Sequence, residues 1–219
     1  MTGTSNPPED YFRHNRVYAW SCVPPGSARV LDVGCGEGYA LDWLRHSRGA
    51  SWLEGIEIDA AAAQAAAGRV DRIHCGDAEN LVAGLAPESF DAVLCLDSLE
   101  HMRDPWRVTR ELVRCLRPGG TFVACLPNVR HWRVTWPLVL HGLWEYQDEG
   151  LLDRTHLRFF TRRSAAGLVE QAGLRIDSIA ALGLEKGTRA RRLARLTLGM
   201  LEPFLEFQYL ITARKTGGR

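Results

Sequence analysis

The sequence lacks several features that would place the protein in a special class. No apolar run among its 219 residues approaches the roughly 20 residues that span a bilayer. The net charge is only +1, so no overall field favours a nucleic acid or a membrane surface. The first residues, MTGTSNPPED, lack the basic-then-apolar order of a secretory signal. With no repeat and no low-complexity linker either, we expect one domain over 1–219, located in the cytoplasm, without a transmembrane segment.

A disulfide framework and a clustered metal motif are also missing. The six cysteines are scattered, and none forms a CxxC pair. Free thiols commonly behave as small buried hydrophobes, so this pattern predicts a reducing compartment and no metal site. A thiol nucleophile stays open as an alternative, but no cysteine has a local signature for it.

What the sequence has in abundance is an alternation of apolar runs with helical stretches. Continuous runs such as AVLCL and TFVACL fit strands that are covered on both faces. Strand–helix–strand alternation then predicts right-handed crossovers and a parallel sheet. The expected strands are Arg29–Val33, Trp52–Ile58, Arg72–Cys75, Phe90–Leu96 and Thr121–Leu126, and the expected helices are Tyr39–His46, Ala60–Arg69 and Trp106–Leu116.

After the fifth strand this alternation breaks. Residues 127–160 form a long connection rich in Trp, His and Arg. Beyond it we expect a helix over Thr161–Ala172, a strand over Arg175–Ala180, a basic amphipathic helix over Gly187–Phe204 interrupted at Pro203, and a last strand over Phe207–Ala213. The basic part, 186–195, could meet an anionic partner or a membrane surface, but a solvated helix face is the favoured interpretation.

The most specific local pattern is VLDVGCGEG, which runs from Val30 to Gly38. It places a buried strand before a glycine-rich turn and a helix, where backbone can approach a ligand closely. The spacing is GxGxG, whereas the dinucleotide fingerprint needs GxGxxG, and Tyr39 stands where its third glycine would be. A purely structural turn is the alternative.

Acidic residues at the ends of successive strands argue against that alternative. Asp32 precedes the glycines, Glu57 ends the second strand, Asp77 follows the third and Asp97 follows the fourth. Ligands of open α/β sheets bind outside the carboxyl ends of the strands, so these carboxylates would surround one crevice. A carboxylate after the second strand can accept hydrogen bonds from a ribose diol, and one after the third from an adenine amine.

Taken in order, LDVGCGEG, GIEID, GDAENL, FDAVLCLDSLEH and LRPGGTF resemble the motifs of class I S-adenosylmethionine (SAM)-dependent methyltransferases. The resemblance covers roughly Tyr11 to Gly173. It implies a Rossmann-like α/β fold with a mostly parallel seven-stranded sheet, a reversed last hairpin, helices on both faces and an insertion after strand five. It also implies SAM as cofactor, S-adenosylhomocysteine (SAH) as product, and a set of cofactor-binding residues. These are Asp32, Gly34, Cys35, Gly36 and Gly38 for the amino-acid end, Glu57 for ribose, Ile58, Asp77 and Ala78 for adenine, and Asp97 for the methionine arm.

The first 28 residues resemble the cap region that covers SAM in these proteins. Tyr11 and Arg16 are its candidates for touching the sulfonium or the carboxylate. An ordinary surface helix is the alternative.

For the chemistry of transfer, His101 is the first candidate for a general base. It lies just beyond the fourth strand, and histidine is the side chain best suited to exchange a proton at physiological pH. The alternative is that the Leu-Glu-His turn only organises its loop. His131 and His156, both in the insertion, are the further catalytic candidates.

The insertion over 127–160 is the expected acceptor site. Its aromatic rings and polar tips suit an amphipathic acceptor such as a sugar or an aromatic ring, although a cap that packs on itself is an equal alternative. Its candidate substrate-binding residues are Asn128, Arg130, Trp132, Arg154 and Arg158.

PNVRHW followed by LLDRTHLRFFT resembles a bacterial subgroup that acts on cell-surface glycans or secondary metabolites. We therefore expect methyl transfer to an oxygen of a small-molecule or glycan-precursor substrate, by a monomer or homodimer. The sequence after the fourth strand is Leu-Asp-Ser-Leu rather than an Asn/Asp-Pro-Pro-Tyr/Phe motif, which argues against nucleic-acid bases as substrate. N- or C-methylation, a catalytically silent SAM-binding partner subunit and an NAD-dependent oxidoreductase are the alternatives.

Overall fold

The structure is a computed structural model that describes residues 17–183, 197 and 200–217. The predicted contacts of Tyr11 and Arg16, and most of the predicted helix over Gly187–Phe204, lie outside these residues. No helix among the described residues is long and apolar enough to cross a membrane.

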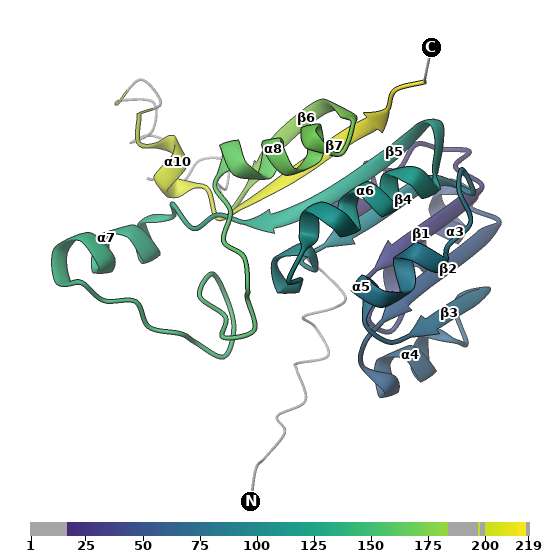
Figure 1. Ribbon diagram of the computed structural model, residues 1–219, viewed down its shortest axis with the longest axis horizontal. Helices are drawn as coiled ribbons and strands as arrows, with labels where there is room; N and C mark the ends of the chain where they lie inside the picture. The colour runs from purple at the N-terminus through teal and green to yellow at the C-terminus, as the bar shows by residue number, and fades with distance from the viewer. Residues whose placement is uncertain (1–16, 184–196, 198–199, 218–219) are drawn as a thin grey trace, which may run out of the picture.

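One seven-stranded sheet in the order β3-β2-β1-β4-β5-β7-β6 forms the centre of the molecule (Figure 1). The first five strands pair in parallel, and β7 runs antiparallel to both of its neighbours. The predicted fold with a reversed last hairpin is thus confirmed. The strands are β1 Arg29–Val33, β2 Trp52–Glu57, β3 Arg72–Cys75, β4 Phe90–Leu96, β5 Leu116–Pro127, β6 Leu174–Leu182 and β7 Gln208–Lys215.

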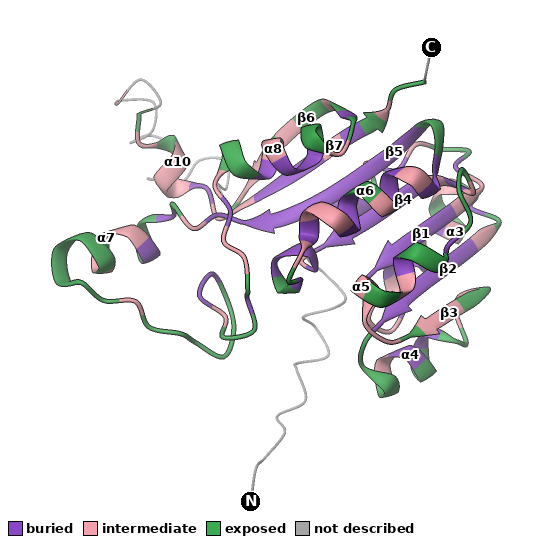
Figure 2. Cartoon of the chain, viewed as in Figure 1, coloured by how far each residue is buried: buried purple, intermediate pink, exposed green. Residues whose placement is uncertain are grey.

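Helices cover both faces of this sheet, and each face has its own core (Figure 2). Leu112 of α6 and Leu168 of α8 pack on one face, whereas Trp20 of α2 and Leu44 of α3 pack on the other. The helices are α2 Val17–Trp20, α3 Tyr39–Arg48, α4 Ala60–Ala66, α5 Ala78–Leu81, α6 Pro105–Cys115, α7 Trp132–His141, α8 Arg162–Gln171 and α10 Glu202–Leu205, with 3₁₀ turns η1 Val82–Gly84 and η2 Leu99–His101.

The helix boundaries follow from capping residues. Asp59, Asp104 and Thr161 each accept a hydrogen bond from a backbone N–H in the first turn of the helix that follows. Gly49 ends α3 in the left-handed conformation, where a side chain would be strained.

Besides small shifts at the ends of other elements, strand β5 and helix α5 differ from the prediction. Strand β5 begins at Leu116 rather than at Thr121, because Pro118-Gly119-Gly120 is accommodated inside the strand where its register with β4 shifts. The one-turn helix α5 was not expected; Asp77 starts it by accepting from the N–H of Glu79 at 2.8 Å.

The predicted connection over 127–160 contains a helix, α7, that the sequence did not reveal. Pro137 lies within α7, and a proline usually ends a helix. The apolar residues of α7 also follow no helical period, and most of its surface is exposed: Trp136 is 57% and Val139 79% exposed. Pro203 likewise lies in the first turn of α10 rather than interrupting a helix.

Candidate active site

The carboxyl ends of β1 and β4 meet at the point where the strand order reverses, which is where open α/β sheets bind ligands. The glycine loop after β1 approaches the end of β4 so closely that a Cβ on Gly34 would lie 3.0 Å from the Cβ of Ser98. Gly34 also has a φ of +78°, which favours glycine. This position therefore requires glycine for two independent reasons.

The second strand holds the glycine loop in place. The N–H groups of Gly34 and Cys35 both donate to the carbonyl of Ile56. The Glu57 carboxylate accepts from the N–H of Gly36 at 2.8 Å and from that of Asp59 at 2.9 Å. Glu57, predicted to bind ribose, thus also orders the loop that lines the site.

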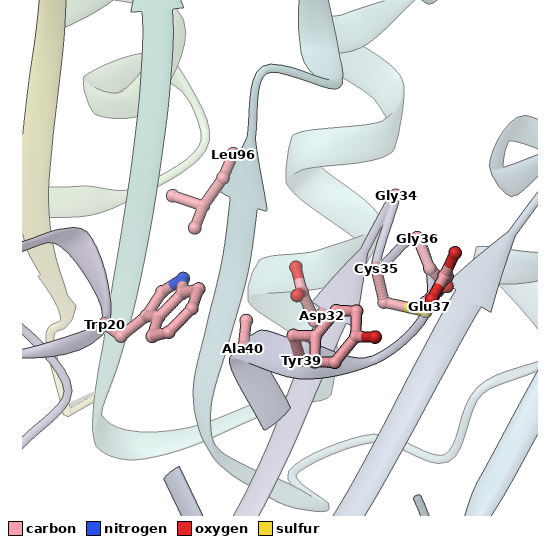
Figure 3. Close-up of a pocket in the computed structure, with 9 residues that line it drawn as sticks. All are labelled: Trp20, Asp32, Gly34, Cys35, Gly36, Glu37, Tyr39, Ala40 and Leu96. Atoms are coloured by element: carbon pink, nitrogen blue, oxygen red, sulfur yellow. Dashed lines mark hydrogen bonds between the residues drawn. The ribbon is translucent and has the colours of Figure 1, made fainter. Parts of the chain in front are cut away.

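A pocket opens between this loop and α2 (Figure 3). Four predicted residues line it, namely Asp32, Gly34, Cys35 and Gly36; among the described residues it is also lined by Trp20, Glu37, Tyr39, Ala40 and Leu96, which the prediction missed. Gly38, Glu57, Ile58, Asp77, Ala78 and Asp97 are not among its lining residues.

Trp20 is the most informative of the missed residues. Its ring packs on Trp43, is 4% exposed, and its Nε1–H has no hydrogen-bond partner among the described residues. A buried donor without a partner costs about 1–3 kcal/mol, so its presence beside a pocket points to a ligand. No sequence pattern marks this indole, because α2 is only one turn long.

The pocket thiol is not a nucleophile. Burial, reinforced by the nearby carboxylates of Asp32 and Glu57, raises the pKa of Cys35 far above its usual range. The thiol therefore stays protonated at neutral pH and acts as a small packing group.

The remaining predicted cofactor residues lie along the same edge of the sheet. The Ile58 side chain follows β2 and is 71% exposed. Asp77 caps α5 through one oxygen and Ala78 is the first residue of that helix, both half-buried. Asp97 ends β4 with a φ of +51° and accepts from the Gln208 side chain at 2.7 Å. A left-handed aspartate at a strand end is a common sign of a functional position.

Beyond Asp97, the turn η2 meets the insertion. The ring of His101 lies 4.8 Å from that of His156, and the buried Glu100 carboxylate lies beside both. Two of the three predicted catalytic histidines are thus brought together. Burial first, and His101 second, lower the pKa of His156. Glu100 was not among the predicted site residues, although it directly precedes His101 in the Leu-Glu-His turn.

The third predicted histidine has a structural task. His131 caps α7, its Nδ1 accepting from the N–H of Arg133 at 3.3 Å, and its ring packs against Phe207. Burial, followed by the charge of Arg133, lowers the pKa of His131 to about 4. The ring is therefore neutral at pH 7, and its Nδ1 is occupied by the hydrogen bond that caps α7.

The predicted substrate residues also divide. Asn128 is fully buried and donates to the carbonyls of Pro203 and Glu206 at 2.8 and 2.7 Å, which gives it a structural task rather than the predicted acceptor contact. Arg158 donates to the carbonyl of Arg103 and so fastens the insertion to the loop before α6.

Three predicted substrate residues are exposed. Arg130 stacks on Phe204 with its guanidinium 4.8 Å from the ring centre, and Trp132 begins α7. Arg154 pairs with Asp148 at 2.7 Å on the surface. These side chains remain accessible to a ligand.

Comparisons with known proteins agree with this geometry. A family model described as a methyltransferase domain matches residues 11–179. A ubiquinone biosynthesis O-methyltransferase of Xanthomonas axonopodis pv. citri is 30% identical over 190 residues, which cover 82% of this chain and 76% of that protein. Methyltransferase GfsG of Streptomyces halstedii is 37% identical over 98 residues, but these are only 42% of this chain and 35% of that protein.

The solved structures show the same fold. A chain from the complex between the Haloferax volcanii Trm112 methyltransferase activator and a methyltransferase superposes with a TM-score of 0.67 at 22% identity, covering 95% of this chain and 92% of that one. The protein therefore belongs to the methyltransferase-domain family and is a class I SAM-dependent methyltransferase.

Proposed function

We propose that the protein transfers the methyl group of SAM to an oxygen of a small molecule, in the class of sugars, glycan precursors and secondary metabolites. One observation carries this proposal: the insertion brings His156 beside Glu100 and His101, which lie in the turn η2 just past the end of β4, and Leu96 of β4 lines the cofactor pocket. The Xanthomonas relative, named for O-methylation, supports oxygen as the acceptor atom.

The pocket suits the amino-acid end of the cofactor. Asp32 supplies a buried carboxylate that complements an ammonium group. Trp20 supplies a buried N–H that has no hydrogen-bond partner within the described part of the chain and that complements a carboxylate. A zwitterionic group would satisfy both at once, which supports this orientation of the cofactor.

The nucleoside end then extends along the edge towards β2 and β3. Glu57 has further lone pairs beyond the two hydrogen bonds it makes with the loop, and these would accept from the ribose hydroxyls. The exposed Ile58 side chain offers an apolar surface to adenine, and Asp77 with Ala78 borders the same end. Asp97 would border the methionine arm.

SAM brings its own positive charge to the reaction, so the chain mainly aligns the two reactants and excludes water. His101 is exposed, its Nδ1 lies 3.0 Å from the Thr155 hydroxyl, and Thr155 in turn donates to Asp153 at 2.6 Å. We assign His101 the task of taking the acceptor proton, while Arg130, Trp132 and Arg154 offer polar and aromatic contacts to the acceptor.

The cellular compartment and the oligomeric state of the protein are also proposals. Four of the six cysteines are buried and all six are free, which supports a reducing compartment such as the cytoplasm. We expect a monomer or a homodimer.

The test is to incubate the protein with SAM carrying a ¹³C-methyl group and a panel of hydroxylated metabolites and sugars. The ¹³C chemical shift of the product distinguishes methyl on oxygen, nitrogen and carbon. An O-methyl product with matching release of SAH supports the proposal. Methyl on nitrogen or carbon, or tight SAH binding without turnover on any acceptor, contradicts it.

A further inference from the structure

The Glu100–His101–His156 cluster combines side chains that bind metals with a local architecture typical of metal sites. One candidate ligand atom from each residue lies within 4.8 Å of the other two. Glu100 and His156 are buried and His101 is exposed, so the cluster has an inner wall and an open side. Two imidazoles and one carboxylate are the ligand set of several catalytic zinc and iron sites.

Both imidazoles are oriented in the way that metal-binding histidines usually are. In a metal-binding histidine, the ring nitrogen that does not bind the metal commonly donates a hydrogen bond to a backbone carbonyl, a carboxylate or a water molecule, which fixes the ring. The Nδ1 of His156 lies 3.4 Å from the carbonyl of Leu151. The Nδ1 of His101 lies 3.3 Å from the carbonyl of Thr155 and 3.0 Å from its hydroxyl. In each ring this leaves Nε2 as the nitrogen for a further ligand.

The two chain segments that carry these ligands are fastened together. The carbonyl of Glu100 accepts from the N–H groups of both Leu157 and Arg158 at 2.9 Å. Thr155 links His101 to Asp153 through its hydroxyl. The cluster is therefore held by backbone hydrogen bonds rather than by chance proximity of flexible side chains.

We infer that Glu100, His101 and His156 bind a divalent transition metal of the zinc type, and that this metal receives the acceptor of the proposed methyl transfer. Donor atoms around tetrahedral zinc lie roughly 3.3 Å apart, so the cluster must close somewhat on binding.

The inference rests on the proposed function and narrows its substrate class. Three protein ligands leave coordination positions open, and two adjacent oxygens, as in a vicinal diol or a catechol, can occupy them. A hydroxyl held there loses its proton to solvent more readily. Its oxygen then bonds to the methyl carbon while the carbon–sulfur bond of SAM breaks, leaving the neutral thioether of SAH. His101 would then act as a ligand rather than as the proton acceptor.

Cobalt(II) is the probe, because its visible absorption reports its coordination. Tag-free protein is titrated with Co²⁺, and Zn²⁺ is then added in competition. The variants are Glu100→Gln and His156→Gln, with His46→Gln as the control, since His46 lies on the exposed face of α3. SAH calorimetry on every variant shows that the fold and the cofactor pocket are intact.

We expect one equivalent of Co²⁺ with tetrahedral-type bands, displacement by Zn²⁺, and at least a tenfold loss of metal affinity in both cluster variants but not in the control. No binding by the wild type, or equal binding by the cluster variants, overturns the metal site. Methyl transfer that continues unchanged after chelation overturns the metal's role in the reaction. Metal binding without any oxygen methylation contradicts the proposed function instead and leaves the site standing.

Discussion

The two halves of the site are built by different means. The cofactor half lies at the ends of buried parallel strands, where backbone hydrogen bonds fix Gly34, Gly36 and Glu57. The proposed acceptor half lies on an insertion that packs a small core of its own and leaves Trp132 and Trp136 exposed. The first half is therefore held by backbone hydrogen bonds, whereas the second presents exposed side chains beside it. Methyltransferases with one cofactor can diverge in acceptor through such an insertion.

The strongest way to test this division is to remove Glu57. Because its carboxylate orders the loop and is proposed to hold the ribose, we expect Glu57→Ala to weaken SAH binding about 10²-fold, or roughly 3 kcal/mol, by calorimetry. The sheet should stay folded, as circular dichroism will show. Glu57→Gln keeps an acceptor oxygen and should lose less; unchanged affinity in both variants would refute the cofactor assignment.

The corresponding change in the acceptor half is His101→Ala. Its loss should lower the rate of methyl transfer by roughly 10²-fold, whether the ring takes a proton or binds a metal, while SAH affinity stays within twofold. His46→Ala, which removes an exposed histidine elsewhere, serves as control. Wild-type turnover in His101→Ala would exclude both roles.

A third prediction concerns the buried His131, to which we assign a structural role in the insertion rather than a catalytic one. Its folded-state pKa of about 4 lies below the unfolded value, so between these values only the unfolded chain binds the proton. Stability should therefore fall as the pH falls, by about 2 kcal/mol at this residue between pH 7 and pH 5. His131→Asn keeps a helix cap but cannot titrate, and denaturant unfolding should show a smaller loss over this range. An equal loss in both proteins would remove His131 as the cause.

Substitution of Trp20 tests which end of the cofactor lies beside the indole. If its Nε1–H binds the carboxylate, Trp20→Phe should weaken SAH binding about tenfold, close to the value of one hydrogen bond to a charged group. Methylthioadenosine lacks the amino-acid arm, so its affinity should not change. Equal loss for both ligands would show that the ring only supports the pocket.

The smallest effect is expected at Arg154, whose ion pair with Asp148 is exposed. Arg154→Ala should leave the melting temperature unchanged within error and raise only the KM for the acceptor. A clear loss of stability would mean that the pair fixes the insertion instead.

The position of the proposed cofactor residues along one edge of the sheet could be predicted from the sequence because its signals are local. A glycine loop after an apolar strand and acids at successive strand ends need only the parallel order of the strands to come together, and that order follows from the alternation of elements. Trp20 escaped prediction because its importance depends on a burial that no local pattern encodes.

For the proposed acceptor half, the sequence predicted the position along the chain but not the roles of the individual residues. The sequence ranked His101 first and did not distinguish His131 from His156. Their surroundings differ in the structure, because His131 caps a helix whereas His101 and His156 meet between a turn and the insertion. Asn128 likewise looked like a polar ligand, yet its amide holds the carbonyls before β7. Such differences depend on contacts between distant segments.

The most direct measurement compares one variant from each half in the same SAH titration. Asp32→Asn removes the buried charge that lines the pocket, and Arg158→Ala removes a bond that fastens the insertion. We expect about a 10²-fold loss of SAH affinity for Asp32→Asn and less than a twofold change for Arg158→Ala. Unchanged binding in Asp32→Asn, or an equal loss in both variants, would contradict the separation of the two halves.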